Sequence, residues 1–289
     1  HAGGSIYTTG VVVSGTPGNA GAYTRITVAA SAPTLYYFCT QHSGMGGQAN
    51  TPVTNSFSNF AGTIQSNISP NTTSKFSIVS YTGTGNDPET IGHGLGVVPK
   101  MILVKDRSTA GGWRVYNENI GNNKILALNL TLASTSSDAW NATTPTSTVF
   151  SVGNDTITNG NGTTTIAYCF AEVQGYSKFG SYKGNGNANG TFVYTGFKPA
   201  FVMVKGYGGT DDWIMMDNKR SGFNSENEYL DANNSSAESD GSGNIDFLSN
   251  GWKARSTFSS INYNGGDYIY MTFAENPFTS AAGTPVTAR

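Results

Sequence analysis

The segment PKMILVK at residues 99–105 has a counterpart, PAFVMVK, at residues 199–205. Each segment is an apolar run of strand length that follows a proline, a pattern typical of a buried β-strand. A tryptophan follows each segment at the same spacing, Trp113 in the first case and Trp213 in the second. Because the proline, the lysine and the tryptophan all keep their spacing, the chain contains an internal repeat.

Further matches extend the repeat in both directions. Upstream, FSIVSYTGTGN at 76–86 parallels FGSYKGNGN at 179–187; downstream, LALN at 126–129 parallels LDAN at 230–233. Each copy closes with the triplet FAE, at 170–172 and at 273–275. A period near 100 residues is too long for a solenoid unit and fits a complete β-sandwich domain. We therefore expect tandem β-sandwich domains at residues 76–176 and 177–289.

The composition favours the same all-β class. Charged residues make up only 12% of the chain, and 37 of the 289 residues are glycine. Asn-Gly pairs, which suit the positive φ angles of two-residue hairpin turns, separate the apolar runs. Aromatic residues, at 12%, are numerous enough to build cores. Residues 51–75 are rich in Thr, Ser and Asn, which predicts an extended linker before the first copy.

Residues 1–50 lie outside the repeat and carry a separate motif. The segment LYYFCTQHSGMGG at 35–47 places Cys39 at the end of an expected strand, with His42 and Met45 following at intervals of three. A thiolate, an imidazole and a thioether together suit copper, with methionine as a weak axial ligand. The segment resembles the ligand loop of the cupredoxins, and this resemblance implies a partial cupredoxin-like β segment.

The copper set is incomplete, so two interpretations stay open. A blue-copper site needs a second histidine, and the only histidine upstream of Cys39 is His1. We expect no cofactor in this chain, and copper only in a longer chain that supplies the upstream ligand. The other interpretation is a cupredoxin-like remnant without a metal role.

Trp113 and Trp213 each follow a glycine-rich turn. Exposed at such a turn, the two rings could stack on the faces of sugars. The alternative is a tryptophan that packs in the core of each domain.

The candidates for catalysis are few. His93, in IGHGLG at 91–96, has no accompanying nucleophile motif, and we expect a loop histidine. Glu172 and Glu275 occupy equivalent positions in the two copies, which indicates a structural role such as accepting backbone N–H groups at a turn. We therefore predict no catalytic residue and a protein that is not an enzyme.

Three longer segments resemble virion proteins of marine tailed phages, in particular tail-fibre and structural proteins of cyanophages. They are IAYCFAEVQGYSKFGSYKGNG at 166–186, FVYTGFKPAFV at 192–202 and DFLSNG at 246–251. The cupredoxin-like segment resembles a module that recurs in the same proteins. The resemblance implies a location on the virion exterior and assigns no catalytic residue.

Together these observations predict a non-enzymatic virion structural protein: a tail fibre, tail or capsid-surface component with a role in host attachment. The expected partners are further copies of the chain, as a homo-oligomer such as a trimer, together with other virion proteins and a host surface glycan. The alternative function is a lectin-like module that binds carbohydrate. A formal net charge of −2 gives no electrostatic drive toward nucleic acid. No apolar run approaches membrane-spanning length, so no membrane insertion is expected.

Overall fold

The protein is an all-β molecule built from several antiparallel sheets, with 43% strand and 3% helix. This confirms the predicted fold class. The computed structural model describes residues 7–16, 19, 21–27, 35–38, 46–49, 56–241, 243–276, 278–279 and 285–286. The chain divides into two compact units, His1–Asn55 and Ser56–Arg289.

The first unit contains two strand pairs. Strands β1 (Val11–Ser14) and β2 (Tyr23–Ile26) pair antiparallel, with Val11 opposite Ile26. Strands β3 (Leu35–Phe38) and β4 (Gly46–Ala49) form a second antiparallel pair, with Phe38 opposite Gly46.

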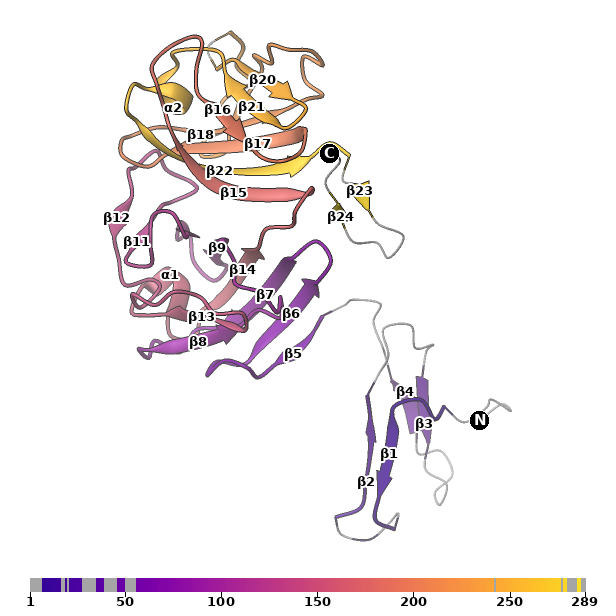
Figure 1. The fold of residues 1–289 in the computed structure, drawn as a ribbon. Helices are drawn as coiled ribbons and strands as arrows, with labels where there is room; N and C mark the ends of the chain where they lie inside the picture. The colour runs from indigo at the N-terminus through magenta and orange to yellow at the C-terminus, as the bar shows by residue number, and fades with distance from the viewer. Residues whose placement is uncertain are drawn as a thin grey trace. The chain divides into compact units, whose positions relative to one another are not determined.

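The second unit begins with a six-stranded sheet that belongs to the first copy of the repeat (Figure 1). In sheet order its strands are β10 (Trp113–Asn117), β9 (Met101–Asp106), β14 (Thr164–Phe170), β7 (Phe76–Thr82), β6 (Ser66–Asn71) and β5 (Phe57–Asn59). A smaller sheet pairs β8 (Glu89–Gly92) with β13 (Val149–Val152). The remaining elements of this copy are β11 (Lys124–Ile125), β12 (Thr135–Ser136) and the short helix α1 (Thr156–Asn159).

The second copy repeats this order of strands. Its larger sheet contains β15 (Ser177–Lys183), β22 (Asp267–Ala274), β17 (Pro199–Gly206), β18 (Trp213–Asp217) and β19 (Leu230–Asp231). Its smaller sheet contains β16 (Phe192–Tyr194), β21 (Gly251–Ala254) and β20 (Ile245–Leu248), and the short helix α2 (Ser259–Asn262) precedes β22. The order β15-β22-β17-β18 reproduces the order β7-β14-β9-β10 of the first copy. After β22, β23 (Phe278–Thr279) pairs with β24 (Pro285–Val286).

Each copy has its own core, formed by alternate side chains along its strands. In β14, Thr165, Ala167 and Cys169 are buried, while the residues between them are only partly buried. This period of two is the signature of a strand whose two faces meet different surroundings. Ala167 and Cys169 pack with Ile91 and Phe150 of the smaller sheet in one core. The equivalent core of the second copy joins residues of β17 and β22 to Val193 and Trp252 of its smaller sheet.

A buried asparagine fixes the same loop in both copies. The side-chain oxygen of Asn159 accepts a hydrogen bond from the Thr84 N–H at 3.0 Å, and that of Asn262 accepts one from the Asn185 N–H at 2.9 Å. Each side-chain amide also donates to a backbone carbonyl of the loop it holds. Because a buried backbone group without a partner destabilises the fold, these two side chains give both copies the same loop conformation.

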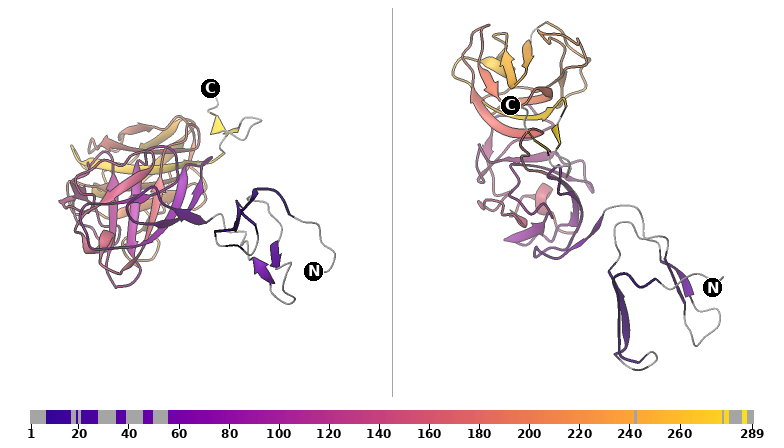
Figure 2. Two further views of the ribbon diagram at one scale, coloured as in Figure 1. Left: turned by 90° about the horizontal axis from the view of Figure 1, so that it is seen from below. Right: turned by 45° about the vertical axis from the view of Figure 1, so that its right-hand side comes forward.

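The other faces of the two larger sheets pack against each other. Figures 1 and 2 show these sheets lying next to each other, with the smaller sheets on the far sides. One apolar cluster, the interface cluster, joins them; its buried members are Met101, Val115, Ile120 and Leu126 from the first copy, and Phe179, Met203, Trp213, Ile269 and Met271 from the second. Strands β9 and β22 are therefore apolar on both faces, which explains the unbroken apolar run at 101–104.

Hydrogen bonds join the two copies around this cluster. The indole N–H of Trp213 donates to the Ala127 carbonyl at 3.0 Å, and Ser134 N–H donates to the Tyr207 carbonyl at 2.9 Å. The Lys205 ammonium donates to the Thr131 carbonyl at 3.0 Å. The segment that follows β11 in the first copy is thus held along the second copy.

Two predicted boundaries differ from the structure. Residues 51–75 were expected to be a linker, yet β5 and β6 lie within them and pair onto β7 through β6. The core side of β6 is formed by Ser66 and Ile68, too few apolar residues for the segment to stand out as a strand. In addition, the two copies were expected to be separate domains, whereas both belong to the single unit Ser56–Arg289.

The two tryptophans provide a matched test of the interface. Trp213 is 1% exposed in the interface cluster, whereas Trp113 is partly exposed and stacks on Tyr168 with ring centroids 6.2 Å apart. We predict that Trp213→Phe lowers the free energy of unfolding by about 1–3 kcal/mol, because it removes buried volume and the indole hydrogen bond to the Ala127 carbonyl. Trp113→Phe should cost less than about 1 kcal/mol. Urea denaturation of both variants checks this, and equal losses would contradict the assigned interface.

Candidate functional site

The proposed copper ligands cannot be placed. Cys39, His42 and Met45 lie outside the described residues, so their copper-binding role stays a prediction. Among the residues that the structure does describe, no three His, Cys, Asp or Glu side chains come together in a metal-binding group. Within the same residues, no helix is long and apolar enough to cross a membrane.

The tryptophans proposed to stack on sugars differ in their surroundings. Trp213 is buried between the two copies, so its ring has no free face, and the stacking hypothesis is wrong for this residue. Trp113 keeps part of its ring accessible, and for this residue the hypothesis stays a prediction. The sequence could not separate the two, because the difference arises from contacts with the other copy.

His93 and the two repeated glutamates make structural contacts. His93 is fully buried; its Nε2 lies 3.1 Å from the Thr146 carbonyl, and its Nδ1 accepts a hydrogen bond from the Leu95 N–H at 3.2 Å. Burial lowers the pKa of His93 and favours the neutral ring that these contacts require. Glu172 accepts a hydrogen bond from the Phe179 N–H at 2.9 Å, while Glu275 pairs with Lys198 at 2.8 Å.

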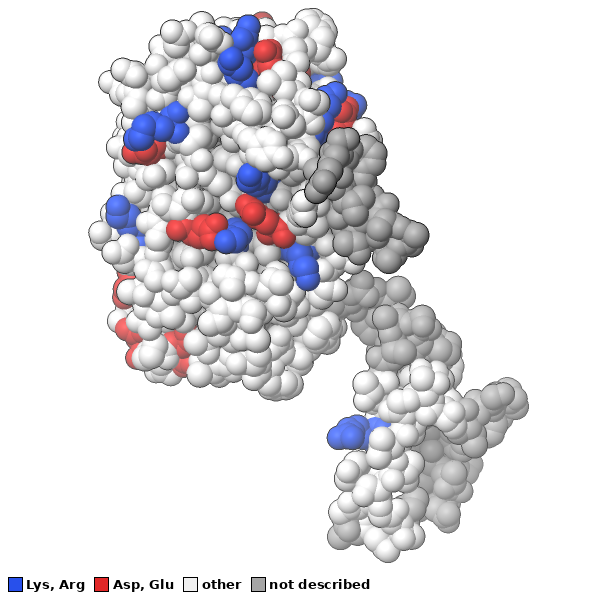
Figure 3. Space-filling view, in the orientation of Figure 1, with Lys and Arg blue, Asp and Glu red and all other residues white. Residues whose placement is uncertain are grey.

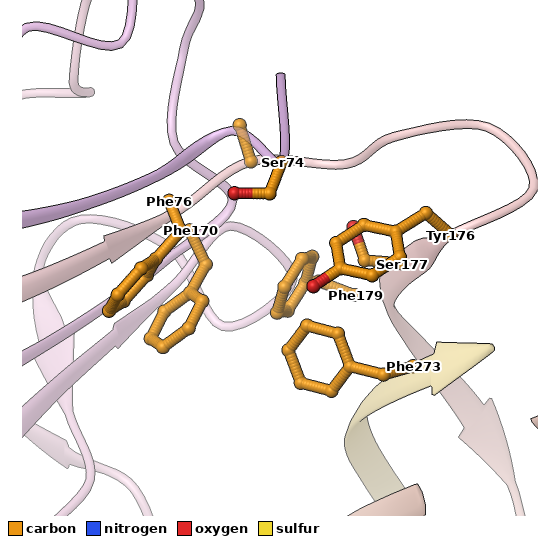
Figure 4. A pocket seen from close by; sticks show the side chains of 8 residues that line it. Ser74, Phe76, Phe170, Tyr176, Ser177, Phe179 and Phe273 are labelled. Carbon is orange, nitrogen blue, oxygen red and sulfur yellow. The ribbon is translucent and has the colours of Figure 1, made fainter. Parts of the chain in front are cut away.

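An aromatic pocket of about 160 Å³ lies where the two copies meet. Figure 4 shows Phe76 and Phe170 of the first copy on one side; on the other lie Phe179 and Phe273 of the second copy, together with Tyr176 at the junction of the two copies. The ring centroids of Phe170 and Phe179 are 5.7 Å apart. Phe170, Phe179 and Phe273 also belong to the interface cluster, so this pocket is the open edge of the contact between copies.

A larger and more polar groove, of about 450 Å³, lies entirely within the second copy. We call it the β17–α2 groove. One wall is the loop after β17, from Gly208 to Asp211, and the other is formed by Ser259 and the segment from Tyr263 to Tyr268 after α2. Tyr263, which lines this groove, is 64% exposed. The sequence analysis did not identify it, since its two walls are about fifty residues apart in the chain.

Comparison of the copies shows how the groove arises. A constant offset aligns Lys105 and Gly111 with Lys205 and Asp211, and each lysine donates to the carbonyl of the second residue, at 2.5 Å in the first copy and 2.7 Å in the second. On the opposite wall, Gly160 of the first copy corresponds to Tyr263. The second copy therefore carries a carboxylate and an aromatic ring where the first copy has glycines.

In each copy the loop that Lys105 or Lys205 holds carries a carboxylate, but at a different sequence position. In the first copy it belongs to Asp106, and in the second, where Gly206 aligns with Asp106, it belongs to Asp211. A Cβ at Gly206 would lie 2.3 Å from Oδ2 of Asp211, so the Asp211 carboxylate fills the space beside this glycine. The glycine is thus required for the close approach of the carboxylate.

The two carboxylates differ in their partners. Asp106 accepts hydrogen bonds from the Ser108 N–H at 2.7 Å and the Thr109 hydroxyl at 2.6 Å. Burial acts to raise its pKa, but these bonds and the Lys105 charge outweigh burial, so the pKa of Asp106 lies below its ordinary value. No described residue donates a hydrogen bond to the Asp211 carboxylate, and burial raises the pKa of Asp211 despite the nearby Lys205.

Lys205 holds the backbone of the loop that forms one wall of the groove. It is fully buried, and its ammonium donates to the carbonyls of Thr131, Gly206 and Asp211, at 3.0, 2.7 and 2.7 Å. Burial lowers the pKa of Lys205 to about 8, against the attraction of Asp211 and Asp212. The residue therefore remains charged at neutral pH and uses its three N–H groups to hold the loop in place.

Charged side chains are sparse on the rest of the described surface, and many of them form ion pairs. Figure 3 shows basic and acidic side chains mostly next to each other on a largely uncharged face. Lys183 pairs with Asp267 at 2.6 Å, and Arg114 pairs with Asp155 at 2.8 Å. The Lys183–Asp267 pair is exposed, and exposed pairs of this kind contribute little to stability.

The matching family model is "Domain of unknown function (DUF7483)", and it covers residues 49–277, well over half of the chain. The chain belongs to the DUF7483 family. The matched range of this DUF7483 protein begins before β5 and ends after β22, so one model includes both copies and the strands β5 and β6. No curated protein and no solved structure shows a significant match to the chain.

Asp106 and Asp211 should contribute differently to the stability of the fold. We predict that Asp106→Ala lowers the free energy of unfolding at pH 7 by about 1–3 kcal/mol, because two hydrogen bonds to a carboxylate are lost. Since the pKa of Asp106 is depressed in the folded state, this loss should shrink as the pH falls below about 4.

Asp211→Ala is the matched control. The raised pKa of Asp211 means that its charged form is disfavoured in the folded state, so removing it should leave stability unchanged or slightly higher at pH 7. Urea denaturation at pH 7 and at several pH values below 4 measures both effects. A loss for Asp211→Ala as large as that for Asp106→Ala would show that the second carboxylate also has a stabilising partner.

Proposed function

We propose that this DUF7483 protein is a non-enzymatic structural component of the exterior of a tailed-phage particle: a tail fibre, tail or capsid-surface protein that contributes to host attachment. Two things support the proposal. One is the resemblance of three long segments to marine phage virion proteins. The other is the architecture of residues 56–276, in which two copies of one β fold are joined into a single unit.

The interface cluster is the observation that carries the structural role. A hinge between the copies would open apolar surface from both larger sheets, and burial of each large side chain contributes about 1.5–3 kcal/mol. Trp213, Lys205 and Ser134 add hydrogen bonds across the same contact. Such a unit suits a part that must keep its shape outside the cell.

We further propose that each copy is a compact β-sandwich and that residues 1–50 form a partial cupredoxin-like segment. The shared core between a larger and a smaller sheet in each copy supports the first point. The motif of Cys39, His42 and Met45 supports the second, with copper restricted to a longer chain that supplies a second histidine. Assembly is expected as a homo-oligomer, with a trimer as the symmetric form typical of phage fibres.

A second candidate function is a carbohydrate-binding surface module. The β17–α2 groove favours it, because an exposed tyrosine ring and an unpaired carboxylate line the same opening. The two functions are compatible, since host attachment by phage fibres commonly relies on many weak sites acting together.

Immunogold electron microscopy tests the proposed location. Antibodies raised against the full chain should label the outside of intact phage particles whose genome encodes it, at a fixed position relative to the tail. Particles of a phage that lacks the coding sequence serve as the control. Absence of the protein from purified particles, established by mass spectrometry together with absent gold label, would contradict the proposal.

A further inference from the structure

We infer that the β17–α2 groove of the second copy binds an uncharged saccharide. The inference goes beyond the virion role, because it assigns a ligand class to a particular site and can be tested on the isolated protein. It rests on three features of the groove: an exposed aromatic ring, a carboxylate without a donor, and polar groups on both walls.

Tyr263 supplies the stacking surface. It lies directly after α2, where its N–H donates to the hydroxyl of Tyr268 at 2.7 Å, so the backbone that carries the ring is fixed from within the core. Tyr268 is itself buried and donates to the Ser259 carbonyl. Tyr263 is 64% exposed at the groove, and an exposed aromatic ring matches the apolar C–H face of a pyranose.

Asp211 supplies the hydrogen-bond acceptor. Its carboxylate is half-buried and has no donor among the described residues, whereas the corresponding carboxylate of the first copy, from Asp106, has two. Neutral hydroxyl groups can donate strong hydrogen bonds to this carboxylate, because a bond to an ionised acceptor is charge-assisted even when the donor is uncharged. Neighbouring hydroxyls of a sugar present such donors in pairs.

The charges around the groove select against anionic ligands. Asp211 and Asp267 both line it, and the Lys183 ammonium that could attract an anion is already paired with Asp267 at 2.6 Å. A phosphate or an acidic sugar would meet the free carboxylate of Asp211. The volume of about 450 Å³ is within the range of small-ligand sites and accommodates one or two sugar rings.

The first copy lacks these features at the same place. Gly160 replaces the tyrosine, and Gly111 replaces the aspartate. A Cβ at Gly111 would lie 3.4 Å from Cγ1 of Ile157, whose counterpart in the second copy is Ser260. The groove therefore depends on side chains that only the second copy carries, and substitution at these positions can remove the site without changing the repeated core.

Saturation-transfer NMR on the full chain tests the inference. The probes are the methyl glycosides of glucose, galactose, mannose and N-acetylglucosamine at millimolar concentration, with glucuronic acid as the charged comparison. We expect at least one neutral glycoside to bind, and both Tyr263→Ala and Asp211→Asn to weaken its binding by about tenfold or more. Glucuronic acid should bind more weakly than the neutral sugar.

Tyr194→Ala is the matched control. Tyr194 is 58% exposed in the same copy but does not line the groove, so this variant should bind the glycoside as the unmodified protein does. Melting curves for the variants establish that each is folded. Failure of every neutral glycoside to bind, or unchanged binding in both groove variants, would overturn the inference; neither result bears on the particle location measured by immunogold.

Discussion

The contact between the two larger sheets is the constraint on which the rest of this structure depends. Strands β9, β17 and β22 carry apolar side chains on both faces, so one face of each sheet remains to be covered after its own core has formed. A sheet face that bears Met203, Trp213 and Met271 is unstable in water. The two copies solve this problem by covering each other, and neither is complete alone. The two copies therefore form one compact unit and not two separate domains.

Duplication also separates what the fold requires from what a site requires. Asn159 and Asn262, or Lys105 and Lys205, make the same bonds in both copies because the loops they hold are part of the shared scaffold. Asp211 and Tyr263, in contrast, stand where the first copy has glycines. Asp211 has no hydrogen-bond donor to its carboxylate among the described residues, and burial disfavours its charged form. The proposed saccharide would supply hydroxyl donors to this carboxylate in place of water.

The sequence predicted the repeat, the buried strands at 101–104 and 201–204, and the all-β class, because strand periodicity and the spacing of Pro, Lys and Trp are local signals. It did not predict β5 and β6, since a strand whose core face is made by Ser66 and Ile68 has the composition of a linker. Nor could it place Trp113 and Trp213 in different surroundings, because that difference comes from the other copy. Two substitutions that shape the groove can be found in the sequence alone. A comparison of the copies position by position pairs Gly160 with Tyr263 and Gly111 with Asp211.

Native-state hydrogen exchange on the full chain tests the central claim most directly. If the copies stabilise each other through the interface cluster, the most protected amides of β14 and of β22 should exchange through the same global opening, with equal free energies. They should also respond equally to Trp213→Phe, although this residue belongs to the second copy only. Two distinct opening free energies, with β14 unaffected by that substitution, would show that the copies are independent domains.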